Sequence, residues 1–214
     1  ALAYFEQGEA APSKPTLLFV HATGFHGRIW DMIIASFPDF HVIALEQRGH
    51  GRSDKLAVTD WKTFGRDQAE FVSALDLNHI IGIGHSMGGH SMIDAAAISQ
   101  RFARLLLLDP TVASPDTYTS PEPIEWDQLH PAAKRRNQFA TSDEMFEQLR
   151  SKSSFPLFDP QILRDYCEFG LEESASGGLE LCCQPEIEAH VYMSARSNGS
   201  VYDSVHALEI PVTV

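Results

Sequence analysis

The residues best suited to chemistry are Gly84-His85-Ser86-Met87-Gly88, which follow an apolar run and precede an Ala-rich helical pattern. G-x-S-x-G between a strand and a helix predicts a nucleophile elbow, a strained turn that lifts the serine hydroxyl above a sheet. The two glycines are expected where strand and helix cross too closely for a side chain. The alternative, a chance match in a glycine-containing loop, is disfavoured by the flanking strand and helix. We therefore predict that Ser86 is a nucleophile.

A nearly identical string follows five residues later and provides an internal comparison. In Gly89-His90-Ser91-Met92, the position that Gly88 fills for Ser86 is occupied by Ile93. An isoleucine side chain does not fit the close crossing of an elbow, so Ser91 is expected to lie along the following helix. The prediction rests on Ser86 alone.

The chemistry of such a serine can be argued from charge. An ester carbonyl attacked by Ser86 becomes a tetrahedral oxyanion, and the amide of Met87 is expected at the positive amino end of a helix. A serine hydroxyl is a weak nucleophile near neutral pH, so it needs a histidine base that a carboxylate orients. A reaction at Ser86 therefore requires two further groups, a histidine base and a carboxylate.

Composition limits the partners. The chain has 214 residues, 43% of them hydrophobic, and a formal net charge of -13. Because this charge repels phosphate groups, we expect no nucleic-acid partner and no membrane, only a small-molecule ester substrate. Cys167, Cys182 and Cys183 suit free thiols in a reducing compartment, which favours a cytoplasmic location. No ligand spacing predicts a metal, and no cofactor is expected.

The elements that position Ser86 alternate between strand and helix. Apolar runs predict strands at 16–20, 41–45, 80–83 and 105–108, and helical spacing predicts helices at 28–36, 61–75 and 87–100. This alternation predicts an α/β fold with a mostly parallel open sheet and flanking helices. Residues 1–113 are expected to form the first part of this core.

The alternation of strands and helices ends after Pro110, where prolines recur and long apolar runs stop. Residues 114–207 are predicted to form a helical cap, or lid, without strands, with helices at 131–150, 160–170 and 185–195. Apolar side chains of this segment are expected to cover Ser86, among them Phe139, Phe146, Leu149, Phe155 and Phe158. Residues 208–214 are expected to begin the next core strand.

Three motifs in this order carry a resemblance to a known family: the elbow, the loop His21-Ala22-Thr23-Gly24-Phe25, and the segment Gln47-Arg48-Gly49-His50-Gly51-Arg52-Ser53. Over residues 15–110 the chain resembles the α/β-hydrolase superfamily, in its capped, esterase-like serine-hydrolase branch. The resemblance implies an oxyanion hole made by the amide of Met87 and one amide of the His21 loop, from Thr23, Gly24 or Phe25. It also implies a cap over the pocket. Glu46 stands where many members have aspartate.

The resemblance further implies the chain order serine, acid, histidine. Asp109 is the candidate acid, because some capped members carry the carboxylate after this strand; the competing interpretation is that Asp109 only turns the chain toward the cap. None of the histidines near the motifs or in the cap suits the order for the base: His21, His26, His50, His85, His90, His130, His190 and His206. We therefore expect the base, and with it the C-terminal strands, beyond Val214. The alternative is a complete protein that uses an internal histidine with Asp109.

Two functions from different classes remain. The first is a serine hydrolase that cleaves a small carboxylic ester or related acyl compound through an acyl-enzyme on Ser86, with carbon-carbon hydrolases and cofactor-free peroxidase-like relatives sharing the same nucleophile. Dehalogenases and epoxide hydrolases of this fold are excluded, since they need aspartate at this position. The second is a receptor-like member that binds a ligand with little or no turnover.

Overall fold

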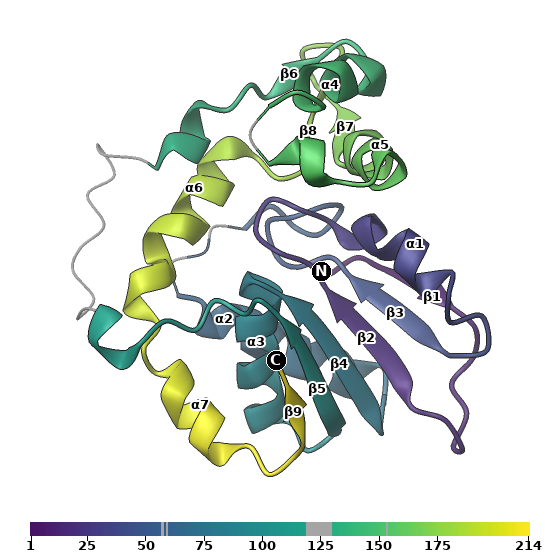
Figure 1. The fold of residues 1–214 in the computed structure, drawn as a ribbon, viewed down its shortest axis with the longest axis vertical. Helices are drawn as coiled ribbons and strands as arrows, with labels where there is room; N and C mark the ends of the chain where they lie inside the picture. The colour runs from purple at the N-terminus through teal and green to yellow at the C-terminus, as the bar shows by residue number, and fades with distance from the viewer. Residues whose placement is uncertain (57, 59, 119–129, 153) are drawn as a thin grey trace.

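A parallel sheet organises the chain (Figure 1). The computed structural model describes residues 1–56, 58, 60–118, 130–152 and 154–214, and within them the main sheet has six strands in the order β1-β3-β2-β4-β5-β9. All neighbours pair in parallel except β1, which runs antiparallel to β3. The strands are β1 (Tyr4–Gln7), β2 (Thr16–Val20), β3 (Val42–Leu45), β4 (Ile80–His85), β5 (Phe102–Leu108) and β9 (Val212–Thr213). The predicted fold class is confirmed.

The central strands are apolar because both faces of the sheet are covered there. Every residue of β2 and β3 is buried, as expected for strands inside a parallel sheet. Val20 pairs with Leu45 on one side and with Gly84 on the other, so the carboxyl ends of β2, β3 and β4 lie level. This register brings the His21 loop beside the elbow.

Different helices cover the two faces. Leu18, Val20 and their neighbours on one face pack against α2 (Lys62–Ala74), α3 (Met87–Ile98) and the start of α7 (Val201–Ala207). Leu17 and Phe19 point to the other face, where η1 (Gly27–Trp30) and α1 (Asp31–Ile34) supply Trp30 and Ile34. Beside α1 this second face forms an apolar groove of about 330 Å³ that reaches Leu106 and Leu108.

Residues 130–152 and 154–197, called the cap from here on, form a second layer, drawn above the sheet in Figure 1. Its sheet has the order β6-β8-β7, so the expectation of a cap without strands was wrong. The predicted helix at 131–150 is divided into a 3-10 turn, a strand and a shorter helix. The elements are η3 (Pro131–Lys134), β6 (Gln138–Phe139), α4 (Ser142–Leu149), η4 (Phe155–Leu157), α5 (Pro160–Phe169), β7 (Leu171–Glu173), β8 (Leu179–Leu181), α6 (Pro185–Ser194) and η5 (Ala195–Ser197).

The cap has its own small core and contacts the loops above the main sheet. Phe139, Phe146 and Leu149 are buried together, and Phe25 from the His21 loop packs against this cluster. The chain leaves the main core through η2 (Pro115–Thr117) and returns with α7, where Val201 joins the core beneath α3. In the part of the chain that the structure describes, no helix combines the length and apolar character needed to cross a membrane.

Candidate active site

Ser86 lies in a strained turn between β4 and α3. Its backbone has φ 54° and ψ -117°, a conformation that residues with a side chain rarely adopt outside functional sites. A Cβ on Gly84 would lie 2.5 Å from the carbonyl oxygen of Gly88, and a Cβ on Gly88 would lie 2.5 Å from that of Val20. Only glycine fits at these two positions, so strand and helix can cross closely enough to present Ser86.

Backbone hydrogen bonds hold the turn in place. The Ser86 amide donates to the carbonyl of Leu108 at 3.0 Å, and the Ser86 carbonyl accepts from the amides of His90 and Thr111, each at 3.1 Å. The half-buried Ser86 hydroxyl lies 3.1 Å from the hydroxyl of Thr111. Thr111 was not among the predicted site residues. Its position in the sequence could have indicated it, because Thr111 is the first residue with a hydroxyl group after β5, the strand that neighbours β4.

The His21 loop approaches the start of α3. The Thr23 hydroxyl donates to the Met87 sulfur at 3.4 Å, and both side chains are buried. The Phe25 amide donates to the Ala22 carbonyl at 3.2 Å, so this amide is hydrogen-bonded within its own loop. Thr23 thus contacts the side chain of Met87, and Met87 is the first residue of α3, where the helix dipole is positive.

Ser91 lies inside α3 and is fully buried. Its hydroxyl donates to the side-chain oxygen of Gln47 at 3.0 Å and lies 2.6 Å from the Gln68 side-chain nitrogen, which donates to it. These bonds join α3 to α2 and to the loop after β3. Ser91 is a structural hydroxyl in this geometry.

Asp109 follows β5 with φ 45° and is exposed. Among the described residues, no hydrogen bond links it to Ser86. Its charge acts instead on His85: burial lowers the pKa of His85, and Asp109 opposes this effect. The structure therefore places the predicted acid near the elbow but not against its hydroxyl.

The histidines of the loops are used in structural contacts. Both ring nitrogens of His21 are occupied, Nδ1 at 2.8 Å from the Ala22 carbonyl and Nε2 accepting from the Gln47 amide at 3.0 Å. Burial lowers the pKa of His26 and of His50 to about 4. Among the described residues, the hydrogen bond of the Ser86 hydroxyl is made with Thr111 and not with an imidazole.

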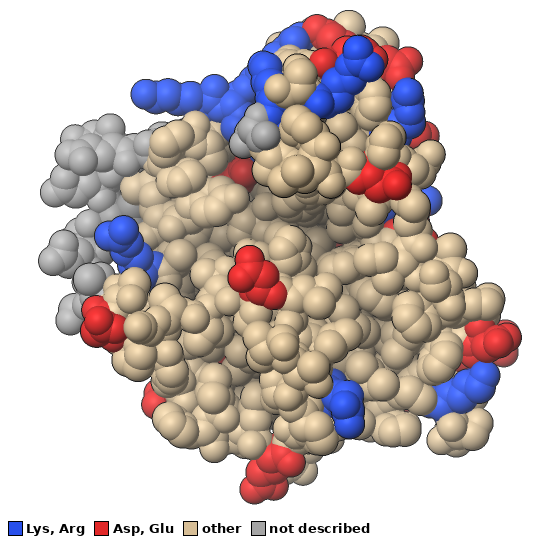
Figure 2. Space-filling view, viewed as in Figure 1, with Lys and Arg blue, Asp and Glu red and all other residues tan. Residues whose placement is uncertain are grey.

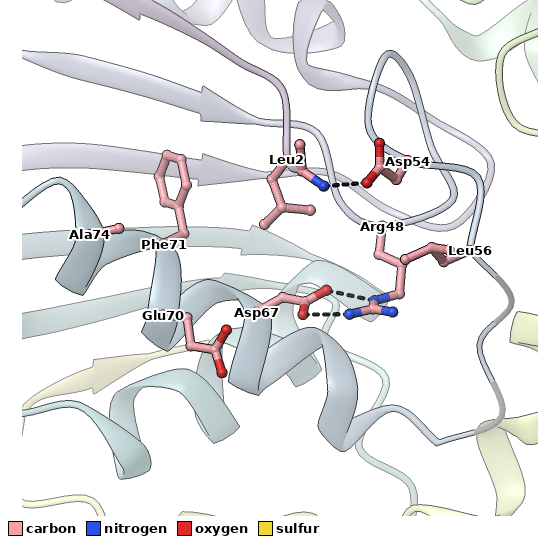
Figure 3. Close-up of a pocket in the computed structure, with 9 residues that line it drawn as sticks. Leu2, Arg48, Asp54, Leu56, Asp67, Glu70, Phe71 and Ala74 are labelled. Atoms are coloured by element: carbon pink, nitrogen blue, oxygen red, sulfur yellow. Dashed lines mark hydrogen bonds and ion pairs between the residues drawn. The ribbon is translucent and has the colours of Figure 1, made fainter.

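The segment Gln47 to Ser53 is a structural loop built around Glu46. The buried Glu46 carboxylate accepts from the amides of Gly27 at 3.2 Å and Arg52 at 2.6 Å. Arg48 forms a bidentate pair with Asp67 of α2, both bonds at 2.7 Å (Figure 3). The cavity of about 360 Å³ beside this pair borders the N-terminal residues and α2, and no elbow residue lines it.

A second cavity, of about 460 Å³, lies between the His21 loop and the cap. Thr23 and Gly24 line its core side, and aromatic rings of the cap line much of the rest: Phe155, Phe158, Tyr166 and Tyr192. Figure 2 shows the molecular surface hollowed between cap and core. Thr23, which lines this cavity, also contacts Met87, the residue after Ser86.

One buried ion pair lies within the cap and is linked to the His21 loop through Tyr166. The Arg135 guanidinium donates to the Glu188 carboxylate and, at 2.9 Å, to the Tyr166 hydroxyl, which donates in turn to the Gly24 carbonyl at 3.4 Å. Burial works against the charge of Arg135, but Tyr166 and Glu188 raise its pKa. A Cβ on Gly24, whose φ is +78°, would lie 2.7 Å from Glu188 Oε1. Arg135, Tyr166 and Glu188 were not predicted, since their contacts with one another join residues 31 and 53 positions apart and the contact of Tyr166 with Gly24 joins residues 142 positions apart.

Comparisons with known proteins agree with this architecture. The chain is 33% identical over 133 residues to a non-heme chloroperoxidase of Streptomyces lividans, covering 58% of this chain and 48% of that protein. It is 36% identical over 107 residues to a lipase of Mycobacterium tuberculosis, covering 48% of this chain and 40% of the lipase. The chain therefore spans about half, or less, of the length of these relatives.

The fold matches solved structures over nearly its whole length. The crystal structure of E-2-(acetamidomethylene)succinate hydrolase superposes with a TM-score of 0.77 at 23% identity, covering 99% of this chain and 74% of that one. The family model described as the alpha/beta hydrolase family matches residues 17–180. This match covers well over half of the chain and includes the elbow, the His21 loop and much of the cap. The chain belongs to the alpha/beta hydrolase family.

Proposed function

We propose that this protein is a serine hydrolase that cleaves a small carboxylic ester or related acyl compound through an acyl-enzyme on Ser86. The observation that carries the proposal is the backbone of Ser86, held at φ 54° between two glycines that admit no side chain. Strain of this kind persists only where the surrounding structure enforces it. Here it presents one hydroxyl at the amino end of α3.

In this proposal the attack of Ser86 on the carbonyl places negative charge beside the Met87 and Thr23 amides. Removing one donor of such a pair typically costs roughly 3 to 4 kcal/mol of barrier. The proton of Ser86 passes to a general base and then to the leaving alcohol, and water later releases the acyl group. Asp109 is retained as the candidate acid because it follows the strand beside the elbow and its charge reaches His85.

The acyl group is proposed to occupy the cavity under the cap. Its lining is aromatic on the cap side and includes Thr23 on the core side. The named relatives include a lipase, a chloroperoxidase and succinate hydrolases, which favour acyl chemistry without selecting one substrate. No cofactor or metal enters this proposal.

Hydrolysis of p-nitrophenyl acetate by the protein tests the proposal, with intact mass spectrometry after rapid acid quench. We expect steady release of p-nitrophenol and a transient mass increase of one acetyl group, both absent in Ser86→Ala and retained in Ser91→Ala. Binding without release, the behaviour of a receptor-like member, would contradict the proposal.

A further inference from the structure

The Ser86 hydroxyl begins a short chain of contacts that leads into the core. Its Oγ lies 3.1 Å from Thr111 Oγ1, and this is its hydrogen bond within the described residues. Thr111 stands three residues beyond the end of β5, next to the carboxyl end of β4. The importance of this contact for the reaction rests on the proposed function, in which Ser86 is the nucleophile.

The backbone of Thr111 is fixed on both sides. Its amide donates to the Ser86 carbonyl at 3.1 Å, and its carbonyl accepts from His90 Nδ1 at 2.8 Å. The His90 amide donates to the same Ser86 carbonyl at 3.1 Å. Ser86, His90 and Thr111 thus form a closed ring of hydrogen bonds, so the contact between the two hydroxyls does not depend on a mobile surface side chain.

His90 is enclosed by side chains of its own helix α3 and by Trp61. Only 1% of it is exposed, and the ring of Trp61, at the start of α2, meets it edge-on with centroids 4.9 Å apart. A carbonyl oxygen only accepts, so the bond to Thr111 requires a proton on Nδ1. Nε2 faces Asp94 Oδ2 of α3 at 3.8 Å, and Asp94 Oδ1 accepts from Ser204 of α7 at 2.6 Å.

We propose that the Thr111 hydroxyl donates to Ser86 Oγ and holds it in the attacking rotamer, and that His90 is the positioning residue that keeps Thr111 there. Donation in this direction leaves the Ser86 proton free to pass to a base. As that proton leaves, negative charge grows on Oγ, and a hydrogen bond to a charged acceptor is stronger than one to a neutral hydroxyl. The Thr111 proton stays on Thr111 throughout.

Thr111→Val, which keeps the shape and removes the hydroxyl, is expected to lower kcat about three- to tenfold with KM unchanged, the size of one net hydrogen bond. Thr111→Ser keeps the hydroxyl and is expected to restore most of the rate. His90→Asn, whose amide nitrogen takes the place of Nδ1, is expected to retain more activity than His90→Leu. Thr16→Val is the matched control, because the Thr16 hydroxyl is likewise hydrogen-bonded, to His41 at 2.9 Å, but at the far end of β2.

The test measures p-nitrophenyl acetate hydrolysis and the rate of fluorophosphonate labelling for the full-length protein, with urea denaturation to confirm that each variant folds. Slower labelling and lower kcat in Thr111→Val, with Thr111→Ser and Thr16→Val near the parent, support the inference. Equal rates for Thr111→Val and the parent overturn it while the proposed function stands. Equal rates for His90→Asn and His90→Leu overturn the part assigned to His90. A parent protein that neither hydrolyses nor labels overturns the nucleophile assignment and this inference with it.

Discussion

Replacing Gly88 with alanine has two opposite effects on stability, a gain in helix propensity and a steric overlap. Alanine is favoured over glycine within a helix by at most about 1 kcal/mol, which acting alone would stabilise α3. The new Cβ would lie 2.5 Å from the Val20 carbonyl oxygen and 2.6 Å from that of His21. Both are backbone atoms, and Val20 is paired with β3 and β4, so neither oxygen can move aside cheaply.

Relief of this overlap requires α3 and the end of β2 to separate. Overpacking in a well-packed interior costs roughly 1 to 3 kcal/mol, occasionally more. Because both overlaps are with backbone atoms, we take the upper end, about 3 kcal/mol. After subtraction of the propensity gain of about 1 kcal/mol, we expect Gly88→Ala to lower the free energy of unfolding by about 2 kcal/mol. The same separation shifts Met87, whose amide is the proposed oxyanion donor, so the fluorophosphonate reaction of Ser86 is expected to slow at least about tenfold, because that donor is misplaced.

Urea denaturation and labelling kinetics measure these two effects. Ala97→Gly provides the control within α3, because it reports the propensity difference, about 1 kcal/mol, without a contact at the crossing. A Gly88→Ala protein that is as stable as the parent, and labels at the same rate, would refute the reasoning that glycine is required by the close crossing.

Three further predictions concern the loops and the cap. Acidification from pH 6.5 to pH 4 is expected to lower the free energy of unfolding, because burial lowers the folded pKa of His26 and His50 to about 4 and only the unfolded rings bind protons in that window. In urea denaturation, His50→Asn should show a weaker dependence of this free energy on pH. The same pH dependence in His50→Asn and the parent would contradict the prediction. Arg135→Met leaves the buried Glu188 carboxylate unpaired and is expected to cost about 3 kcal/mol, most of it recovered in Arg135→Met/Glu188→Met. Equal losses in the single and double variants, measured by urea denaturation, would speak against a buried pair. Phe158→Ala, at the wall of the cap cavity, is expected to change KM across p-nitrophenyl esters of increasing acyl length more than it changes kcat for acetate, and identical profiles would place the acyl group elsewhere.

The first half of the chain was predictable because a parallel sheet covered on both faces demands unbroken apolar runs. The run at 16–20 is β2, the run at 41–45 contains all of β3, and the run at 80–83 is the first part of β4. The elbow was equally visible, since its two glycines are required by contacts with backbone atoms. Such steric requirements leave a pattern in the local sequence.

The cap was predicted less well because its strands are two or three residues long, too short to show a periodicity. The signal that α4 begins at Ser142 was present in Thr141, whose hydroxyl accepts from the Glu144 amide at 3.1 Å as an N-cap. The helical interpretation of 131–150 passed over it. Helices that start with proline, α5 and α6, were predicted to within one residue.

Within the site, the residues of the G-x-S-x-G motif were predicted, but the residues that contact the site from distant parts of the sequence were not. Ser86 and Met87 follow from the elbow, but Thr111 reaches Ser86 from the loop after β5, and Glu188 reaches Gly24 from α6. Pairings of this kind are set by the crossing of elements distant in sequence. A single sequence carries no local pattern for them.

Peptide mapping after fluorophosphonate treatment of the protein tests the central claim most directly, because the probe reacts only with an activated serine. The account predicts modification of Ser86, loss of labelling in Ser86→Ala, and unchanged labelling in Ser91→Ala. Modification of Ser91, or equal labelling of the Ser86→Ala protein, would contradict it.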